Sequence, residues 1–256
     1  MLEVRNLQKT FVSGVIRKRT VQAVKGVSFA IEDGKTFGIV GNSGCGKSTI
    51  ARILLSLIPP DGGEIRVDGQ DVLYGDPTFR RAMTRRIQII FQHPESSLDP
   101  SKRIGVSLSE PMRIHRMYDA AGRARRIAEL MRLVDLDGGL LERYPHQISG
   151  GEAQRIMIVR ALTLDPRILI LDEPTSMLDV SIQAQVMNIL KDLQRQLGLS
   201  YLFISHDLDV VRWLCDDLAV MREGEFVESG SAEQVVARPQ HPFAKELISS
   251  FNVQDF

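Results

Sequence analysis

Short apolar runs that predict strands alternate along the chain with stretches of helical spacing. Leu2-Glu3-Val4 alternates apolar and polar side chains, and residues 21–31 carry Val24, Val27, Phe29 and Ile31 in a second extended run. Ile168–Leu171 is apolar at every position, which is typical of a parallel strand buried on both faces. This mixture of patterns predicts an α/β fold.

The remaining runs extend this alternation. Further strands are predicted at 37–40, 64–67, 87–91 (ending at Gln92), 201–205 and, as a pair around Glu223-Gly224, within 218–230. Helical spacing predicts helices after Gly46 up to Pro59-Pro60, with Leu57 on the apolar face, over 120–134, and over 182–197, where Gly198 ends the helix. Residues 13–20 read as an exposed loop and 79–86 as a solvated helix face. Between His93 and Gln147, Pro94, Pro100 and Pro111 predict a loop that precedes the 120–134 helix, so this stretch reads as an inserted helical lobe.

Composition excludes several classes of protein. The chain has 256 residues, 32 basic and 32 acidic, so no net charge favours broad attraction to nucleic acid or anionic lipid. The two cysteines, Cys45 and Cys215, are too few for a disulfide framework or a metal cluster and indicate a reducing compartment. We find no secretory signal pattern and no apolar run near the roughly 20 residues of a membrane span, so we expect a chain that is soluble by itself.

A glycine-rich loop joins the predicted strand at 37–40 to the following helix. Its sequence fits the phosphate-binding pattern G-x-x-x-x-G-K-[ST] in the strand–loop–helix context that the pattern needs. Glycines let the loop backbone turn its N–H groups toward phosphate oxygens, and the helix adds the positive end of its dipole. The predicted nucleotide-binding residues are Gly41, Asn42, Ser43, Gly44, Cys45, Gly46, Lys47, Ser48 and Thr49, with Lys47 on the β- and γ-phosphates and Ser48 on Mg²⁺.

Two carboxylates follow the apolar strand at 168–171. This is the edge at which α/β folds bind their ligands. Asp172 is placed to hold Mg²⁺ through water, and Glu173 can act as general base on the water that attacks the γ-phosphate. Strands that end in acidic residues are common, so the prediction depends on the phosphate loop found upstream.

Ser149-Gly150-Gly151-Glu152 stands at the start of an apolar helix. Ser149 and Glu152 have the spacing of a capping box, in which each side chain binds the other's backbone N–H. Two glycines in the first turn cost about 1 kcal/mol each relative to alanine. They are explained if a phosphate approaches this backbone, and that phosphate would belong to a nucleotide bound by a second copy of the chain.

Together these motifs resemble those of the ATP-binding cassette ATPases, the nucleotide-binding subunits of ABC transporters, over nearly the whole chain. The resemblance implies a P-loop NTPase core of the ABC type with an N-terminal antiparallel β subdomain and an inserted α-helical subdomain. It assigns residues 1–92 and 155–256 to the core and 93–154 to the helical subdomain. Ile148–Glu152 resembles the family signature L-S-G-G-Q, with glutamate in place of glutamine, and the cofactors implied are ATP and Mg²⁺.

The same resemblance assigns four further site residues. Gln92 looks like the glutamine that senses Mg²⁺ and the membrane partner, and Asp179 lies in Ser176-Met177-Leu178-Asp179, which is similar to the family's S-A-L-D. His206, after the strand at 201–205, looks like the histidine that contacts the γ-phosphate and joins Lys47 and Glu173 as catalytic residues. Phe11 would stack on adenine, although a buried core phenylalanine is an equal alternative.

Short runs resemble the peptide and nickel importers within this family: 91–94, 97–100, 144–147 and His241-Pro242-Phe243. That branch implies a peripheral subunit on the cytoplasmic face of the cell membrane, with a second cassette (identical or different), two permease subunits and, indirectly, an external solute-binding protein. Nucleic acid is not an expected partner. The alternatives are the ATPase of an exporter and a soluble ABC ATPase outside transport, which in its DNA-repair or translation forms would need a long coiled-coil insertion or a second cassette.

Overall fold

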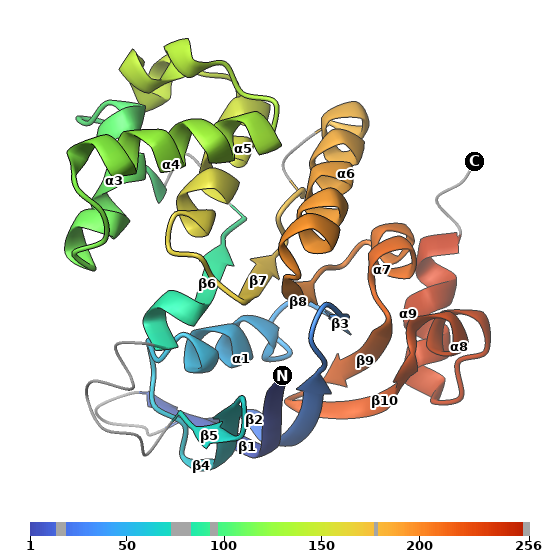
Figure 1. Cartoon of the computed structure of the whole chain (residues 1–256). Helices are drawn as coiled ribbons and strands as arrows, with labels where there is room; N and C mark the ends of the chain where they lie inside the picture. Colours follow the sequence, from blue (N-terminus) through green and yellow to red (C-terminus); the bar gives the residue numbers. More distant parts are fainter. Residues whose placement is uncertain (14–18, 73–82, 93–96, 177–178, 253–256) are drawn as a thin grey trace. The chain divides into compact units, whose positions relative to one another are not determined.

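The computed structural model of the chain describes residues 1–13, 19–72, 83–92, 97–176 and 179–252 (Figure 1). The chain divides into two compact units. Unit 1 comprises residues 1–87 and 200–256, and unit 2 comprises residues 88–199. We describe each unit by itself, with the element labels of Figure 1.

An antiparallel sheet forms the N-terminal part of unit 1. Its strands are β1 (Leu2–Ser13), β2 (Arg19–Ile31), β4 (Gly62–Val67) and β5 (Gln70–Asp71), in the order β2-β1-β4-β5. Leu2 pairs with Ile31 on one side and with Val67 on the other, and all three side chains are buried. Alternate positions of each strand therefore face one apolar layer, which confirms the predicted period of two and the antiparallel subdomain.

A second sheet of unit 1 holds the parallel strands. β3 (Thr36–Val40) pairs in parallel with β8 (Ser200–Ile204) and with β9 (Asp217–Arg222), and β10 (Glu225–Ser231) closes an antiparallel hairpin with β9. Phe29 of β2 stacks on Phe37 of β3 with ring centroids 4.9 Å apart, and Phe226 of β10 lies against both. This aromatic cluster packs the two sheets of unit 1 together.

Four helices of unit 1 lie with both ends inside the described residues. They are α1 (Lys47–Leu54), α7 (Leu208–Leu214), α8 (Ala232–Ala237) and α9 (Pro242–Asn252). Glu228 of β10 fixes the approach to α9, since its carboxylate accepts the backbone N–H groups of Gln240 (2.9 Å) and His241 (2.8 Å). The last helix is therefore held to the sheet by side chains rather than by chain continuity alone.

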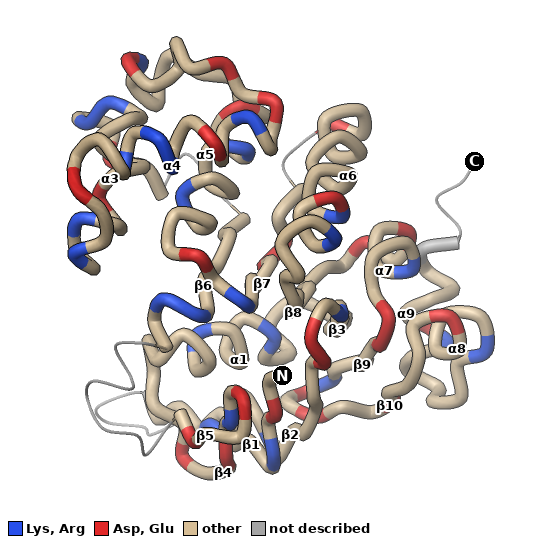
Figure 2. Tube along the Cα trace, in the orientation of Figure 1, with Lys and Arg blue, Asp and Glu red and all other residues tan. Residues whose placement is uncertain are grey.

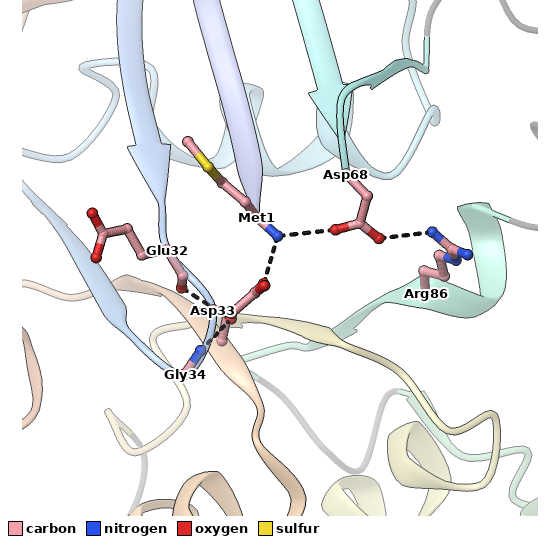
Figure 3. A network of polar contacts seen from close by, with 7 residues as sticks. Met1, Glu32, Asp33, Gly34, Asp68 and Arg86 are labelled. Carbon is pink, nitrogen blue, oxygen red and sulfur yellow. Dashed lines mark hydrogen bonds and ion pairs between the residues drawn. The ribbon is translucent and has the colours of Figure 1, made fainter.

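An ionic network ties the edge of the antiparallel sheet to the turn after β2 (Figure 3). The amino group of Met1 lies 2.5 Å from Asp33 and 3.0 Å from Asp68, and Asp68 also accepts from Arg86 at 3.0 Å. Desolvation acts to lower the pKa of this amino group, but the hydrogen bonds to Asp33 and Asp68 outweigh it and raise the pKa. The predicted Asp33-Gly34 turn is confirmed, with Gly34 at a φ of 74°.

Unit 2 is mainly helical. Its helices are α3 (Ile104–Ile114), α4 (Ala120–Leu133), α5 (Gly150–Leu162) and α6 (Val180–Leu197), with the 3-10 turns Gly138–Glu142 and Pro145–Gln147. Helix α5 packs on α3, α4 and α6. The strands β6 (Ile87–Ile90) and β7 (Ile168–Asp172) are neighbours. The predicted apolar face of the 120–134 helix is confirmed, because Ile127, Leu130, Met131 and Val134 are all at most 4% exposed.

Three predictions at element ends are wrong. Helix α1 ends at Leu54 rather than near Pro59, because Ser56 adopts a left-handed φ of 57° and the N–H of Leu57 closes back on Arg52 at 2.9 Å. Leu57 is therefore 61% exposed instead of lining the core. Strand β6 stops at Ile90, one residue early, which leaves Phe91 at 39% exposure.

The third error concerns Pro111, which lies inside α3 and not in a loop. A proline inside a helix costs about 3 kcal/mol, because it removes one backbone hydrogen bond and clashes with the preceding turn. Ile104, Leu108 and Met112 recur every four residues, and each is 0% exposed. Full burial of three large side chains at roughly 2 kcal/mol each outweighs the proline penalty. Of the predicted loop at 13–20, residues 14–18 lie outside the described residues, and the others belong to β1 and β2. Of the predicted helix face at 79–86, residues 79–82 lie outside them, and residues 83–86 are helical.

Charge is distributed along the chain as the composition suggests. Basic and acidic residues are interspersed along the chain in both units (Figure 2). Among the helices of the described ranges, none combines the length and the apolar character that crossing a bilayer requires.

Candidate functional site

The phosphate loop of unit 1 connects β3 to α1 as predicted. Gly41 and Gly46 have φ angles of 153° and 117°, which are strained for residues with a side chain. A Cβ on Gly41 would lie 2.1 Å from the carbonyl oxygen of Met221, and one on Gly46 would lie 2.1 Å from that of Ala23. Both glycines are therefore required by close backbone contacts, one with β9 and one with β2.

Lys47 lies inside the curve of this loop. Its side chain is 7% exposed, and its ammonium donates to the carbonyl of Gly41 at 2.6 Å and to that of Asn42 at 3.0 Å. Since these contacts fix the ammonium against the loop backbone, a phosphate that enters the loop meets a positive charge already in position.

The start of α1 suits an anion. Its N-cap is Gly46, which offers no side-chain cap, and the first turn contains no acidic residue. Lys47 at the first position places a positive charge at the positive end of the helix dipole, an arrangement that costs stability unless an anion binds there. Ser48 is exposed at the second position. Loop geometry and donor set thus fit a nucleotide phosphate.

His206 belongs to the same unit as the loop. Strands β3 and β8 are parallel neighbours with Ile39 opposite Ile204, so both end at the same edge of the sheet. The loop follows one strand and His206 follows the other. Asp207 fixes the turn, because its N–H donates to the Ser205 hydroxyl at 2.9 Å and its carboxylate caps α7. His206 itself is exposed.

Phe11 lies in β1 opposite Val21 and is 41% exposed. The buried-core alternative is therefore wrong. Lys9 places its ammonium 5.6 Å from the centroid of the ring, so this face of the phenylalanine already contacts a cation. Its stacking on adenine stays a prediction.

The carboxylate pair lies in unit 2. Asp172 is the last residue of β7 and is half-buried. Glu173 follows with a φ of 50°, a left-handed conformation that costs roughly 1–3 kcal/mol in a residue with a side chain. The hydroxyl and the N–H of Ser176 donate to the Glu173 carbonyl at 3.2 and 3.4 Å and hold this turn. The chain therefore leaves the extended conformation of β7 at Glu173, and the role of Glu173 as general base stays a prediction.

The capping box at the start of α5 is confirmed. The N–H and the hydroxyl of Ser149 donate to the Glu152 carboxylate at 2.7 and 2.8 Å, and the Glu152 N–H donates back to the hydroxyl at 3.3 Å. These bonds lower the pKa of Glu152, with the backbone N–H of Ser149 as the largest cause. The carboxylate is therefore ionised at neutral pH.

The two glycines between them differ in their surroundings. Gly150 is exposed, whereas Gly151 is buried, and a Cβ on Gly151 would lie 2.9 Å from Ile182 of α6. Packing of α5 on α6 therefore accounts for Gly151 without a ligand. Only Gly150 still depends on the phosphate explanation.

Gln92 and Asp179 complete the predicted residues of unit 2. Gln92 is half-buried, two residues after β6. Asp179 caps α6 by accepting the N–H of Ile182 at 2.9 Å, which gives it a structural role whatever else it contacts. Met177 and Leu178 lie outside the described residues.

Sequence reasoning missed a cavity of about 310 Å³ beside the phosphate loop. It is lined by Asn42, Ser43, Gly44, Cys45, Arg222, Glu223, Phe243 and Glu246. The guanidinium of Arg222 lies 4.9 Å from the ring of Phe243, so α9 contributes to the surroundings of the loop. The run His241-Pro242-Phe243 was the only available signal, and it had served solely as a marker of the family branch.

Comparison with known proteins agrees with these motifs. The family described as ABC transporter matches residues 24–176. The chain is 47% identical over 233 residues to the dipeptide transport ATP-binding protein DppF of Escherichia coli strain K12, covering 91% of this chain and 70% of that protein. It is 44% identical over 258 residues to the oligopeptide transport ATP-binding protein AppF of Bacillus subtilis strain 168, covering 99% of this chain and 78% of that protein.

Solved structures give the same result. The cbiO1 subunit of Clostridium perfringens, part of the ABC transporter complex cbiONQ, is similar with a TM-score of 0.79 at 26% identity, covering 99% of this chain and 95% of that one. The dimeric ATP-binding cassette MJ0796 in a post-hydrolysis state bound to ADP and Pi is similar with a TM-score of 0.78 at 27% identity, covering 91% of this chain and 99% of that one. With a family match over more than half of its length and relatives above 40% identity, the chain belongs to the ATP-binding cassette ATPases, the ATP-hydrolysing subunits of ABC transporters.

Proposed function

We propose that this chain hydrolyses ATP to drive peptide import through a separate membrane permease. The observation that carries the proposal is the identity of 44–47% to cassettes named for dipeptide and oligopeptide transport, over at least 90% of the chain. Nickel, the other solute suggested by the sequence motifs, is the alternative cargo. The cassette would act as a peripheral subunit at the cytoplasmic face of the cell membrane.

The catalytic proposal assigns roles to residues of both units. Lys47 would bind the β- and γ-phosphates, Glu173 would take the proton of the attacking water, and His206 would contact the γ-phosphate. Mg²⁺ would be held by Ser48, by Gln92 and, through water, by Asp172, where it would neutralise charge on the phosphate oxygens. The buried ammonium of Lys47 supports this assignment, since its contacts with the loop carbonyls position it before any ligand binds, and the left-handed backbone of Glu173 is typical of functional sites.

A dimer of cassettes is part of the proposal. Ser149 and Gly150, at the start of α5, would contact the nucleotide held by the phosphate loop of the partner, and Asp179 would reach the partner. The dimeric relative MJ0796 supports this arrangement. The partner is either a second copy of this chain or a different cassette. Residues 93–154 would form the subdomain that meets two permease subunits, and residues 1–92 with 155–256 would form the core. An external solute-binding protein would deliver the peptide to those permease subunits.

Uptake in cells that lack this chain tests the function. The cells receive the native gene, Glu173→Gln or the matched control Glu233→Gln, whose side chain is exposed on α8. A labelled dipeptide and nickel are offered in parallel. We expect dipeptide uptake to be restored by the native chain and by Glu233→Gln but not by Glu173→Gln. If the native chain restores nickel uptake alone, nickel is the cargo and the peptide proposal is wrong. If it restores uptake of neither solute, an exporter or a cassette outside transport is favoured.

A further inference from the structure

Arg160 of unit 2 links three segments that are distant in sequence. It lies in the last turn of α5, the helix that begins with the Ser149–Glu152 capping box. Its guanidinium donates to the carbonyl oxygen of Ser97 at 2.7 Å and lies 3.7 Å from the carboxylate of Glu110 on α3. One side chain therefore joins α5 to α3 and to the segment that follows Gln92.

That segment, residues 97–103, is held at several points. The ammonium of Lys102 donates to Glu110 at 2.9 Å and lies 3.4 Å from Asp99, while the hydroxyl and the N–H of Ser101 donate to Asp99 at 2.6 and 3.0 Å. Leu98 is 3% exposed, so the segment also has an apolar anchor. Residues 97–103 are therefore attached to the helices and do not form a free loop.

Glu110 is shared by the two cations. Lys102 and, more weakly, Arg160 lower the pKa of this carboxyl, so it stays ionised and keeps both partners. Arg160 and Glu110 are 28% and 34% exposed, and ion pairs at such exposure contribute little to stability. The planar guanidinium does, however, fix two directions at once, toward a carbonyl and toward a carboxylate, which a lysine ammonium does less well.

We propose that Arg160 is a positioning residue that couples the segment after Gln92 to the signature helix α5. Helix α5 has 13 residues, and its hydrogen-bonded backbone makes it a rod of about 20 Å. Displacement of residues 97–103 pulls on its last turn and shifts Ser149 at its first. The inference rests on the proposed function, in which Gln92 responds to Mg²⁺ and the permease and Ser149 contacts a nucleotide.

The competing explanation is that Arg160 only stabilises unit 2. Arg126 provides a matched control in the same unit. It lies on α4, is 23% exposed, and its guanidinium is 2.6 Å from Asp165 in the loop after α5. Removing this pair breaks a similar contact between a helix and a loop without touching residues 97–103.

Hydrogen exchange on the full chain separates the two explanations. We would use the Glu173→Gln background to prevent turnover and a protein concentration at which sedimentation shows a monomer. Exchange of the peptides that cover 97–103 and 149–157 would be measured with and without Mg-ATP, in the background itself and after adding Arg160→Met, Arg160→Lys or Arg126→Met. Lys47→Met in the same background would report whether ATP binds at the phosphate loop.

In the background and after Arg126→Met, we expect Mg-ATP to change the hydrogen-exchange rate of the 149–157 peptide by at least threefold. After Arg160→Met we expect a change of less than 1.5-fold, and after Arg160→Lys a change between these values. No ATP response at 149–157 in the background, an unchanged response after Arg160→Met, or an equal loss after Arg126→Met would each overturn the coupling. Absence of any ATP binding that depends on Lys47 would instead refute the proposed function.

Discussion

Gly46→Ala is the substitution whose effect the structure determines most directly. Alanine at φ 117° is strained, and its Cβ would lie 2.1 Å from the carbonyl oxygen of Ala23 and 2.7 Å from the methyl carbon of Met221. Ordinary van der Waals contact begins near 3.4 Å, so the backbone of β2 and the loop must separate by about 1 Å. Strain of roughly 1–2 kcal/mol and overpacking of roughly 1–3 kcal/mol together predict a loss of about 2–5 kcal/mol in the free energy of unfolding.

Gly44→Ala, two residues earlier in the same loop, is the matched control. Gly44 also has a left-handed φ, 77°, but a Cβ there meets no heavy atom within 4 Å among the described residues. Only the backbone strain applies, so we expect a loss of about 1 kcal/mol. The pair separates the cost of a close contact from the cost of the left-handed conformation.

The chain's only tryptophan, Trp213, lies on α7 of unit 1, the unit that holds the loop. Its fluorescence during thermal or urea unfolding therefore reports on the relevant part of the chain. For a protein of this size each kcal/mol corresponds to about 2–4 °C in Tm, so Gly46→Ala is expected to lower Tm by about 4–20 °C and Gly44→Ala by about 2–4 °C. Equal losses for the two variants would refute the packing argument.

Three further outcomes follow from other sites. The hydroxyl of Ser107 is buried on α3 with no hydrogen-bond partner among the described residues. Ser107→Ala should therefore raise the free energy of unfolding, measured by urea titration, by about 1 kcal/mol. A lower free energy of unfolding would indicate that the hydroxyl has a partner outside the described residues. Folding lowers the pKa of Glu152, so its ionised side chain stabilises the fold above the ordinary value of 4.5 and stops doing so as pH falls through the folded-state pKa. The difference in the free energy of unfolding between the native chain and Glu152→Ala should therefore shrink below pH 4.5. A difference that stays constant with pH would contradict the charge argument. Burial raises the pKa of the Cys215 thiol far above neutrality, and the charge of Asp216 is a second cause. Iodoacetamide at pH 8 should therefore alkylate Cys215 only in denaturant, as measured by mass spectrometry of its peptide. Rapid alkylation of the native protein would contradict this burial.

Local patterns were sufficient for the elements that carry the site. The strand before the phosphate loop, the capping box of α5 and the apolar strand before Asp172 each depend on residues within a few positions of one another. Burial and hydrogen bonding then act on neighbours in sequence, and the pattern contains the information. Gly198 illustrates this, since it ends α6 in a left-handed conformation with a φ of 65°, as its position after an apolar stripe predicts.

Some features could not be predicted because they depend on contacts between residues distant in sequence. Pro111 reads as a loop residue until the burial of Leu108 and Met112 against the rest of unit 2 is known. The packing of Gly151 against Ile182, 31 residues later, is also not visible from local sequence, and its nucleotide contact stays a prediction. The hydrogen bond of Arg160 to Ser97 and its ion pair with Glu110 are in the same class, because neither partner lies at a helical spacing from it. No local rule could have found them.

Several of the predicted site residues lie in segments whose local conformation or charge is unfavourable. Glu173 holds a left-handed backbone, α1 starts without a side-chain cap and with a lysine at its positive end, and α5 starts with an exposed glycine. Each of these features costs free energy in the isolated chain. Left-handed residues elsewhere, such as Ser56 at the end of α1, close turns between elements. At the predicted site we expect a bound nucleotide to offset the cost, because the start of α1 leaves backbone N–H groups available to an anion.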